Sequence, residues 1–560
     1  MKRWFPPWPA IPLAVYLGVL LLGPLVALAV TSLWTADLFQ VSRDPTLANY
    51  QLLLDRPLYA GLILKSLSLG LVVALVTVPL GFIAAYALVF AFPRSSGVLL
   101  GLFMVSMLSS YLVRIYAWKA ILGPSGVINL ALVSLGLIDE PLSFLLYGNF
   151  AVVVTLVHIL LPLALLPIYA AMGNIEPQVL EASRDLGGGM LYTLTNVLIP
   201  LARPGLVAAF LFCFVLASAD YVTPQLVGGS DGVMIGRVIA DQFGFSGNAP
   251  LGAALAITLL AGFGGALAVF ALLGNGVGRV SRAASVLTRA RRHCWRLRLP
   301  LLRAAMGAIL VFLYAPLVIV VVVSFNTSTS GILPLKGLTF DWYDKLLRDA
   351  VFHEAIRASL VVAVAAVVGA TSIGGPAAFM IARRRFVGRG ALLALTFGPL
   401  VLPGIVIGVA LLAALGSLGR QGGLWPTAIA HVLVCLPFVV MVLRARLKDF
   451  DRQVEDAGRD LGSSPARVLR TVTLPIMAPT IIGAAILVFG VSLDEFVVTN
   501  FIIGANATIP TMIWGMMRIG VTPTANALAA LILVVSLVLV VLASWVARGR
   551  SGRALVGGLR

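Results

Sequence analysis

Carboxylates next to aromatic residues occur inside long apolar stretches of this 560-residue chain. Asp220 precedes Tyr221, and the pair Asp494 and Glu495 precedes Phe496. Ionisable groups at membrane depth are costly and are usually functional, and an organic cation can stack on an aromatic face. We therefore hypothesise that these five residues line a route for a cationic solute. The alternative is that the acids pair with arginines or cap helix ends at the outer interface.

The sequence offers little support for catalysis. None of its lysines follows a glycine, so there is no GxxxxGK[ST] phosphate loop. His158 and His431 have no metal-ligand spacing, and the three cysteines form no CxxC pair. We expect no catalytic residue, no bound metal and no cofactor, so any ATP and Mg²⁺ would be used by a partner. No nucleophile–base pair supports the alternative of a membrane-embedded enzyme.

Composition identifies an integral membrane protein. The chain is 60% hydrophobic and only 11% charged, with a mean hydropathy of +1.04. A soluble chain would carry about a quarter charged residues. The formal charge of +18 could suggest nucleic acid. However, the basic residues lie between apolar segments and at their ends, where they orient a protein in the membrane. We therefore expect no nucleic-acid partner.

The apolar segments predict an all-α fold, because a helix needs about 20 apolar residues to span a bilayer. About twelve such segments lie near residues 10–33, 60–91, 97–122, 150–172, 205–228, 252–274, 304–324, 358–382, 390–416, 426–443, 480–503 and 526–547. Arginine and lysine clusters precede the first segment, separate the sixth from the seventh, follow the eighth and close the chain. The positive-inside rule places both termini and the central linker in the cytoplasm.

An internal repeat divides the chain into parallel halves. Residues 161–205 align without a gap with residues 436–480, and 14 of these 45 positions are identical. Both copies lie between the fourth and fifth spans of their half, so we expect two docking elements on one face for a two-fold partner. The predicted domains are a first half at 1–274 (core about 60–274, loop 173–205), an Arg-rich linker at 275–303, and a second half at 304–560 (core about 356–547, loop 446–480).

Each repeated loop has the pattern of helix, glycine, helix. Glu181 and Asp456 lie early in a short amphipathic helix, where the helix dipole favours negative charge. Gly187 and Gly462 supply the residue that can take positive φ at the helix end. A second helical stretch is predicted to stop at the prolines Pro200 and Pro475. The pattern indicates a rigid knob that can transmit a push.

The two loops resemble the EAA loop of ABC-type importer permeases. In that family the loop docks on an ATP-hydrolysing subunit, which implies two ATPase copies here. The resemblance assigns this role to Glu181, Ala182, Arg184, Asp185 and Gly187, and to Asp456, Ala457, Arg459, Asp460 and Gly462. The second copy departs from the pattern, since Glu455 precedes Asp456. Which of the two contacts the ATPase stays open. The implied fold is that of a type I ABC importer permease.

Further similarity indicates a subfamily. Residues 218–243 resemble the first of two permeases in spermidine/putrescine importers, and residues 340–347 and 493–529 resemble the second. The chain thus looks like those subunits fused, in a bacterial inner membrane, with one extracytoplasmic binding protein as partner. Permeases for opines, phosphonates, ferric iron and sulfate are also similar, so the substrate stays open. The main alternative is a secondary transporter with twelve spans in two parallel halves.

Overall fold

A computed structural model describes residues 8–37, 40–244, 246–284, 298–328, 335–519 and 522–556. Helices dominate, as predicted. In the described part of the chain, the paired strands are β1 (Thr35–Asp37) and β2 (Gln40–Ser42), which are antiparallel with Ala36 opposite Val41. Residues 285–297 of the predicted Arg-rich linker lie outside the described residues, as do the two chain ends.

The predicted membrane segments all overlap helices. Ten helices of the described residues are long and apolar enough to cross a membrane, and α18 (Arg389–Val401) and α19 (Gly404–Ser417) qualify together as a pair bent by 103°. The last predicted segment coincides with α26 (Pro523–Val556), which contains a shorter apolar stretch. The chain is therefore a multi-pass, all-α membrane protein.

The structure divides into two compact units. The N-terminal unit comprises residues 31–343 and 516–530, and the C-terminal unit comprises residues 1–30, 344–515 and 531–560. The division falls within the helices α16 (Asp341–Arg348), α25 (Ile509–Ile519) and α26.

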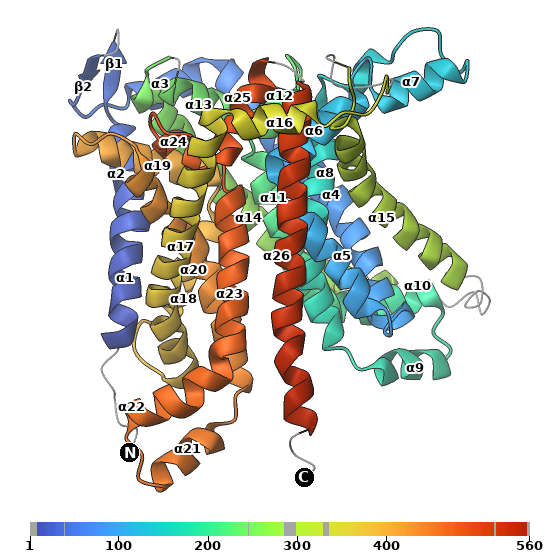
Figure 1. The fold of residues 1–560 in the computed structure, drawn as a ribbon, viewed down its shortest axis with the longest axis vertical. Helices are drawn as coiled ribbons and strands as arrows, with labels where there is room; N and C mark the ends of the chain where they lie inside the picture. The colour runs from blue at the N-terminus through green and yellow to red at the C-terminus, as the bar shows by residue number, and fades with distance from the viewer. Residues whose placement is uncertain are drawn as a thin grey trace. The chain divides into compact units, whose positions relative to one another are not determined.

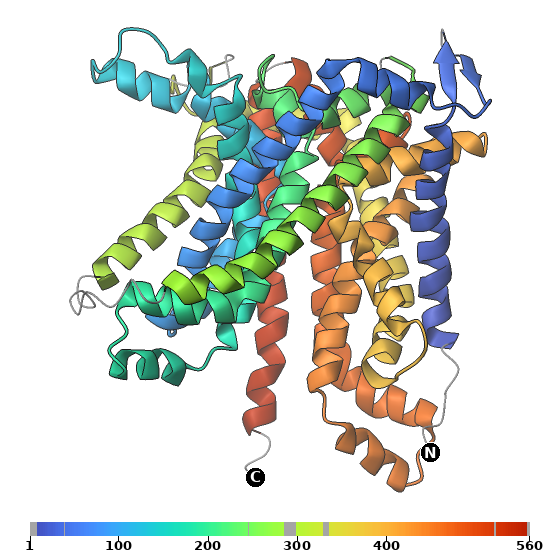
Figure 2. The same ribbon diagram turned by 180° about the vertical axis from the view of Figure 1, so that it is seen from behind.

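The N-terminal unit is built around three helices that pack on one another, α4 (Pro57–Tyr86), α8 (Asn149–Gly173) and α11 (Ile199–Ser218). α14 (Ala249–Ala284), drawn in green in Figure 2, contacts α4, since a Cβ atom on Gly262 would lie 3.8 Å from Leu67 Cδ1. The remaining helical segments are α3 (Ala48–Asp55), η3 (Ala87–Ala91), α5 (Ser96–Leu108), α6 (Tyr111–Leu122), α7 (Val127–Ser134), η4 (Ser143–Leu145), α9 (Pro177–Asp185), α10 (Met190–Thr193), η5 (Leu194–Leu198), α12 (Val222–Val227), α13 (Ile235–Phe243), α14 (Ala249–Ala284) and α15 (Arg298–Val323).

The C-terminal unit has an equivalent core of α17 (Ala350–Arg383), α20 (Leu424–Asp449) and α23 (Leu474–Asp494). The side chain of Asp349 caps α17 by accepting from Val351 N at 2.8 Å. The remaining helical segments are η1 (Trp8–Ala10), α1 (Ile11–Leu17), η2 (Gly18–Leu22), α2 (Gly23–Thr31), α18, α19, α21 (Arg452–Asp460), α22 (Pro465–Val468), η6 (Leu469–Thr473) and α24 (Thr499–Ile502).

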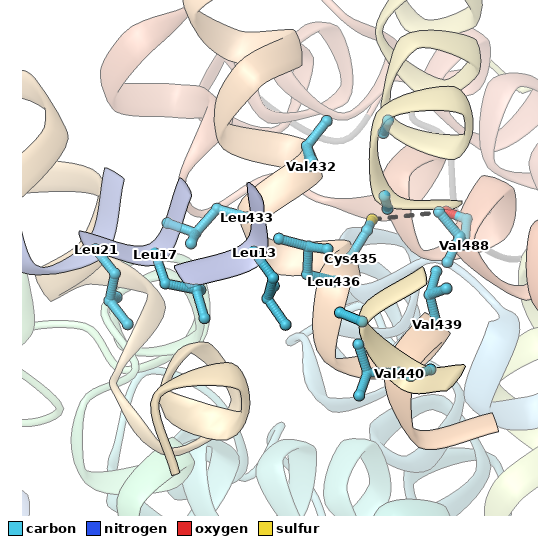
Figure 3. Packing of buried hydrophobic residues seen from close by; sticks show 14 of the residues in the cluster. Leu13, Leu17, Leu21, Val432, Leu433, Cys435, Leu436, Val439, Val440 and Val488 are labelled. Carbon is cyan, nitrogen blue, oxygen red and sulfur yellow. Dashed lines mark hydrogen bonds between the residues drawn. The ribbon is translucent and has the colours of Figure 1, made fainter. Parts of the chain in front are cut away.

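The first helix of the chain packs in the C-terminal unit. Leu13, Leu17 and Leu21 are buried in a core cluster with residues of α17 and α20. Figure 3 shows these leucines beside Leu433 and Leu436 of α20. The cluster also contains Cys435, which is buried.

The first helix of the second sequence half packs, conversely, in the N-terminal unit. Phe312 of α15 forms ring contacts with Trp118 and His158 at centroid distances of 5.5 and 5.4 Å. His158 Nε2 lies 3.0 Å from Leu313 O, and the hydroxyl of Tyr314 donates to Leu102 O at 2.7 Å. The two sequence halves thus exchange their first helices, and the compact units differ there from the sequence halves.

Candidate functional site

Each repeated loop forms the predicted helix and glycine turn. The helices are α9 and α21, and they are followed by Gly187 and Gly462, whose φ angles are +80° and +83°. Equivalent hydrogen bonds close the two turns, from Gly188 N to Ser183 O at 2.8 Å and from Ser463 N to Gly458 O at 3.2 Å. In Figure 1, α9 lies at the lower end of the N-terminal unit, and α21 and α22 lie at the lower end of the C-terminal unit.

The charged residues assigned to these loops are largely exposed. Glu181 and Asp185 are exposed on α9, and Ala182 is exposed beside them. The side chain of Arg184 lies outside the described residues.

Asp456, Ala457, Arg459 and Asp460 are exposed on α21. Asp456 and Arg459 form an ion pair of 3.0 Å. Glu455 is buried, so only Asp456 of the two candidate acids faces solvent.

Apolar side chains on both loops were missed by reasoning from charge and motif. Leu186 and Leu461 are 89% and 88% exposed, and Val179 and Val454 are 39% and 43% exposed. In each loop the valine and the leucine are seven residues apart, which is two helical turns. That spacing within otherwise polar sequence is the signal that could have identified them.

The helix after each turn does not stop at the proline, contrary to the sequence prediction. Pro200 and Pro475 lie in the first turn of α11 and α23, which follow the π-helical segments η5 and η6 without a break. Proline has no N–H and its ring clashes with the carbonyl four residues earlier. A π turn displaces that carbonyl, since Ile199 N donates to Leu194 O and Leu474 N to Leu469 O. Each proline therefore continues a helix.

The fifth membrane helix of each half ends earlier than predicted, directly before the acidic residues. α11 ends at Ser218 and α23 at Asp494. Because a short helix follows each end, Asp220 and Glu495 lie at breaks in the helix. They are 275 residues apart, which is the offset of the internal repeat.

Asp220 accepts hydrogen bonds from the backbone at the start of α12. Its Oδ1 accepts from Val222 N at 2.9 Å, and its Oδ2 accepts from the hydroxyl of Thr223 at 2.6 Å. The hydroxyl of Tyr111 donates to Oδ1 at 2.7 Å. This geometry is the helix-capping arrangement that the sequence left as an alternative.

Glu495 has the same arrangement before α24. Its two carboxylate oxygens accept from Val498 N and Thr499 N at 2.9 and 3.0 Å. His431 Nε2 lies 3.6 Å from Oε2, and its ring also contacts the hydroxyls of Ser492 and Thr499 at 2.7 Å. Both carboxylates therefore satisfy backbone groups that a helix break exposes.

The aromatic partners in the proposed route are buried. Tyr221 and Phe496 are 2% and 1% exposed, and Phe496 packs on Trp514 with ring centroids 5.1 Å apart. Asp494 is the last residue of α23 and is partly buried. The lining role of the five residues stays a prediction. Among the described residues, no group of three or more His, Cys, Asp or Glu residues could hold a metal ion.

Comparison with known proteins identifies the family. Residues 374–552 match the family model of the binding-protein-dependent transport system inner membrane component. The chain is 38% identical over 247 residues to the spermidine/putrescine transport system permease protein PotC of Escherichia coli (strain K12), covering 44% of this chain and 93% of the relative. It is 37% identical to the putrescine transport system permease protein PotI of that strain, covering 40% of this chain and 82% of the relative. It is also 37% identical to its spermidine/putrescine permease PotB, covering 38% and 77%.

The chain therefore belongs to the family of binding-protein-dependent transport inner-membrane components, the permease subunits of ABC importers. Within that family it resembles the polyamine permeases, and it is about twice their length.

Proposed function

We propose that this chain is the fused permease of an ATP-driven, binding-protein-dependent importer, in which α9 and α21 are coupling helices that dock on two ATPase subunits. The observation that carries the proposal is a repeated pair of exposed apolar residues: Val179 in α9 with Leu186 directly after that helix, and Val454 in α21 with Leu461 directly after that helix. A nearly fully exposed leucine at the same position of two related loops, surrounded by charges, fits a surface that a partner covers.

The shape of the loops supports transmission of force. A glycine at positive φ reverses the chain within one residue, and the following helix continues into the fifth membrane span. A displacement of α9 or α21 would therefore reach α11 or α23 through a helical path. Because the sequence has no phosphate loop, ATP and Mg²⁺ would be bound by the ATPase subunits.

Polyamines are the proposed substrate class, since the similar permeases carry spermidine or putrescine in their names. A separate binding protein would deliver the solute, and both termini would face the cytoplasm of a bacterial inner membrane. Asp220 and Glu495, with the neighbouring Tyr221, Asp494 and Phe496, are the proposed lining of the route. Asp220→Asn combined with Glu495→Gln keeps hydrogen-bond acceptors while removing the charge. Unchanged spermidine uptake in that variant would remove these residues from the route.

The docking proposal is tested with Leu186→Asp combined with Leu461→Asp. The variant should insert in the membrane normally, lose copurification of the ATPase and lose spermidine uptake, because the partner would bury two unpaired carboxylates. Leu418→Asp is the matched control, because Leu418 is also a highly exposed leucine at a helix end but lies outside the loops. Full retention of the ATPase by the double variant would contradict the proposal. Uptake that needs only a proton gradient would favour a secondary transporter.

A further inference from the structure

The second loop helix is held by a charged side chain from a membrane-spanning helix. Arg383 is the last residue of α17, and its Nη2 lies 3.3 Å from Glu455 Oε1 in α21. Both side chains are only 7% exposed. The hydroxyl of Thr473, in η6, donates to the same carboxylate oxygen at 3.0 Å. One buried carboxylate thus joins α17, α21 and η6.

Arg383 also contacts the connection that leads into α21. Its Nη1 donates to Phe450 O at 3.4 Å, and its guanidinium carbon lies 5.1 Å from the centroid of the Phe450 ring. Arg452 Nη2 donates to Arg383 O at 3.3 Å. The end of α17 is therefore bound to residues before α21, at its start and within it.

In the N-terminal unit, apolar residues make the contact that corresponds to the one between Glu455 and Thr473. The repeat places Leu180 and Leu198 at the positions of Glu455 and Thr473, and both leucines are buried. A hydrogen bond of 2.8 Å between the hydroxyls of Ser183 and Thr193 joins α9 to α10 instead.

In the C-terminal unit the positions of that serine and threonine carry Gly458 and Val468, and a Cβ atom on Gly458 would lie 3.3 Å from Val468 Cγ2. Each loop thus has one polar and one apolar bridge between its helices. The pair of positions that is polar in one loop is apolar in the other. The polar bridge of the C-terminal unit also includes Arg383, a residue of a membrane helix earlier in the chain.

A buried carboxylate is retained only when its charge is paired and hydrogen-bonded. A leucine at position 455 would fill the same space without that requirement, as Leu180 does. The Arg383–Glu455 pair therefore does more than fill space between α21 and η6. It fixes the distance between α21 and the end of α17, a 34-residue helix that packs on α20 and α23.

Resting on the proposed coupling role of α21, we infer that Arg383 is a positioning residue that links the second coupling helix to α17. A displacement of α21 is then transmitted to two membrane helices, to α23 through η6 and to α17 through the ion pair. Loss of the pair leaves ATPase docking intact but lowers the amount of solute moved for each ATP hydrolysed.

The test measures uptake of radiolabelled spermidine and ATP hydrolysis in proteoliposomes that contain the purified complex of the full chain. Arg383→Met should lower the spermidine-to-ATP ratio about fivefold or more, while copurification of the ATPase stays at the wild-type level. Arg383→Lys should recover part of the ratio, because it keeps the charge without the second N–H group. Arg348→Met is the control, since it removes an arginine from an exposed pair with Asp344.

A second variant separates transmission from folding. Arg383→Met combined with Glu455→Leu and Thr473→Leu reproduces the apolar bridge of the N-terminal unit and leaves no buried charge unpaired. The inference expects this triple variant to assemble fully and to keep the low ratio of Arg383→Met. A wild-type ratio in the triple variant would overturn it, as would loss of the ATPase from Arg383→Met. A wild-type chain that never binds an ATPase would instead refute the proposed function.

Discussion

The hydroxyl of Tyr111 donates a hydrogen bond of 2.7 Å to Oδ1 of Asp220, which lies 109 residues later in the chain. Tyr111 begins α6 directly after two extended residues, Ser109 and Ser110, that separate it from α5. Asp220 lies at the break between α11 and α12. One carboxylate therefore links the break between α5 and α6 to the break between α11 and α12.

In the C-terminal unit the two corresponding interruptions are brought together by helix packing. Leu402 and Pro403 are extended between α18 and α19, and α19 packs on α24. A Cβ atom on Gly408 of α19 would lie 2.6 Å from the ring of Phe501. The lack of a Cβ atom on Gly408 therefore permits this close approach.

Asp220→Ala should destabilise the protein, because it leaves the hydroxyls of Tyr111 and Thr223 and two backbone N–H groups without their acceptor. Each buried unsatisfied group costs about 1–3 kcal/mol. Asp220→Asn keeps an acceptor oxygen and should therefore lose much less stability. Thermal unfolding of the detergent-solubilised protein measures both, with Asp231→Ala, at an exposed position, as the control. Equal melting temperatures for Asp220→Ala and the wild type would contradict the capping role.

Leu17→Ala should destabilise the C-terminal unit, because Leu17 is fully buried against α17 and α20. In lipid the loss comes mainly from packing contacts, and a Leu→Ala cavity costs about 2 kcal/mol or more. Val19→Ala is the matched control on the same helix, since Val19 is 62% exposed and should change stability by less than about 0.5 kcal/mol. Thermal unfolding of both variants gives the comparison. Equal effects would show that the first helix does not pack as described.

The double variant Gly187→Pro with Gly462→Pro should insert normally and lose transport. Proline fixes φ near −65°, whereas φ is +80° at Gly187 and +83° at Gly462. Proline at 462 also removes the hydrogen bond of 2.8 Å from Gly462 N to Arg459 O. ATP-dependent spermidine uptake and the amount of protein in the membrane are the two measurements.

Gly136→Pro is the control for that variant. Gly136 has φ +68°, open space around its Cβ position and an N–H that donates to Val133 O at 3.0 Å, but it lies outside the loops. Gly136→Pro should introduce backbone strain similar to that of the two loop substitutions and leave uptake near the wild-type level. Wild-type uptake in the double glycine variant would contradict the coupling role of the turns.

The sequence predicted features that depend on local spacing. The apolar segments, the two loop helices, the positive φ of Gly187 and Gly462, and the equivalence of Asp220 with Glu495 all follow from hydropathy, turn chemistry or the repeat.

The helical path through Pro200 and Pro475 was predicted wrongly, because a proline usually ends a helix unless a π turn displaces the carbonyl before it. Nothing in the local sequence of either loop marks that turn.

Features that depend on long-range partners could not be predicted. Hydropathy gives the length of α1 but does not reveal that Leu17 packs on helices more than 300 residues away. The sequence alone leaves Glu455 as a second candidate for docking, because it does not reveal the pairing of Glu455 with Arg383, 72 residues earlier. The sequence does not distinguish the exposed Leu186 and Leu461 from buried leucines. Burial, which separates docking residues from packing residues, is a property of the folded chain.

Carbodiimide crosslinking of the assembled complex should join the partner ATPase to Asp456 and Glu181 but not to Glu455. Carbodiimide links a carboxylate to a lysine only where both are accessible. Asp456 and Glu181 are exposed, whereas Glu455 is buried and paired with Arg383. Mass spectrometry of the crosslinked peptides identifies the carboxylates, and Asp456→Asn should remove its crosslink while Glu455→Gln should keep it. The exposed Asp344, outside the loops, serves as the negative control. Crosslinks through Glu455 would show that α21 detaches from α17 in the complex, and the second coupling helix would then dock through a different face.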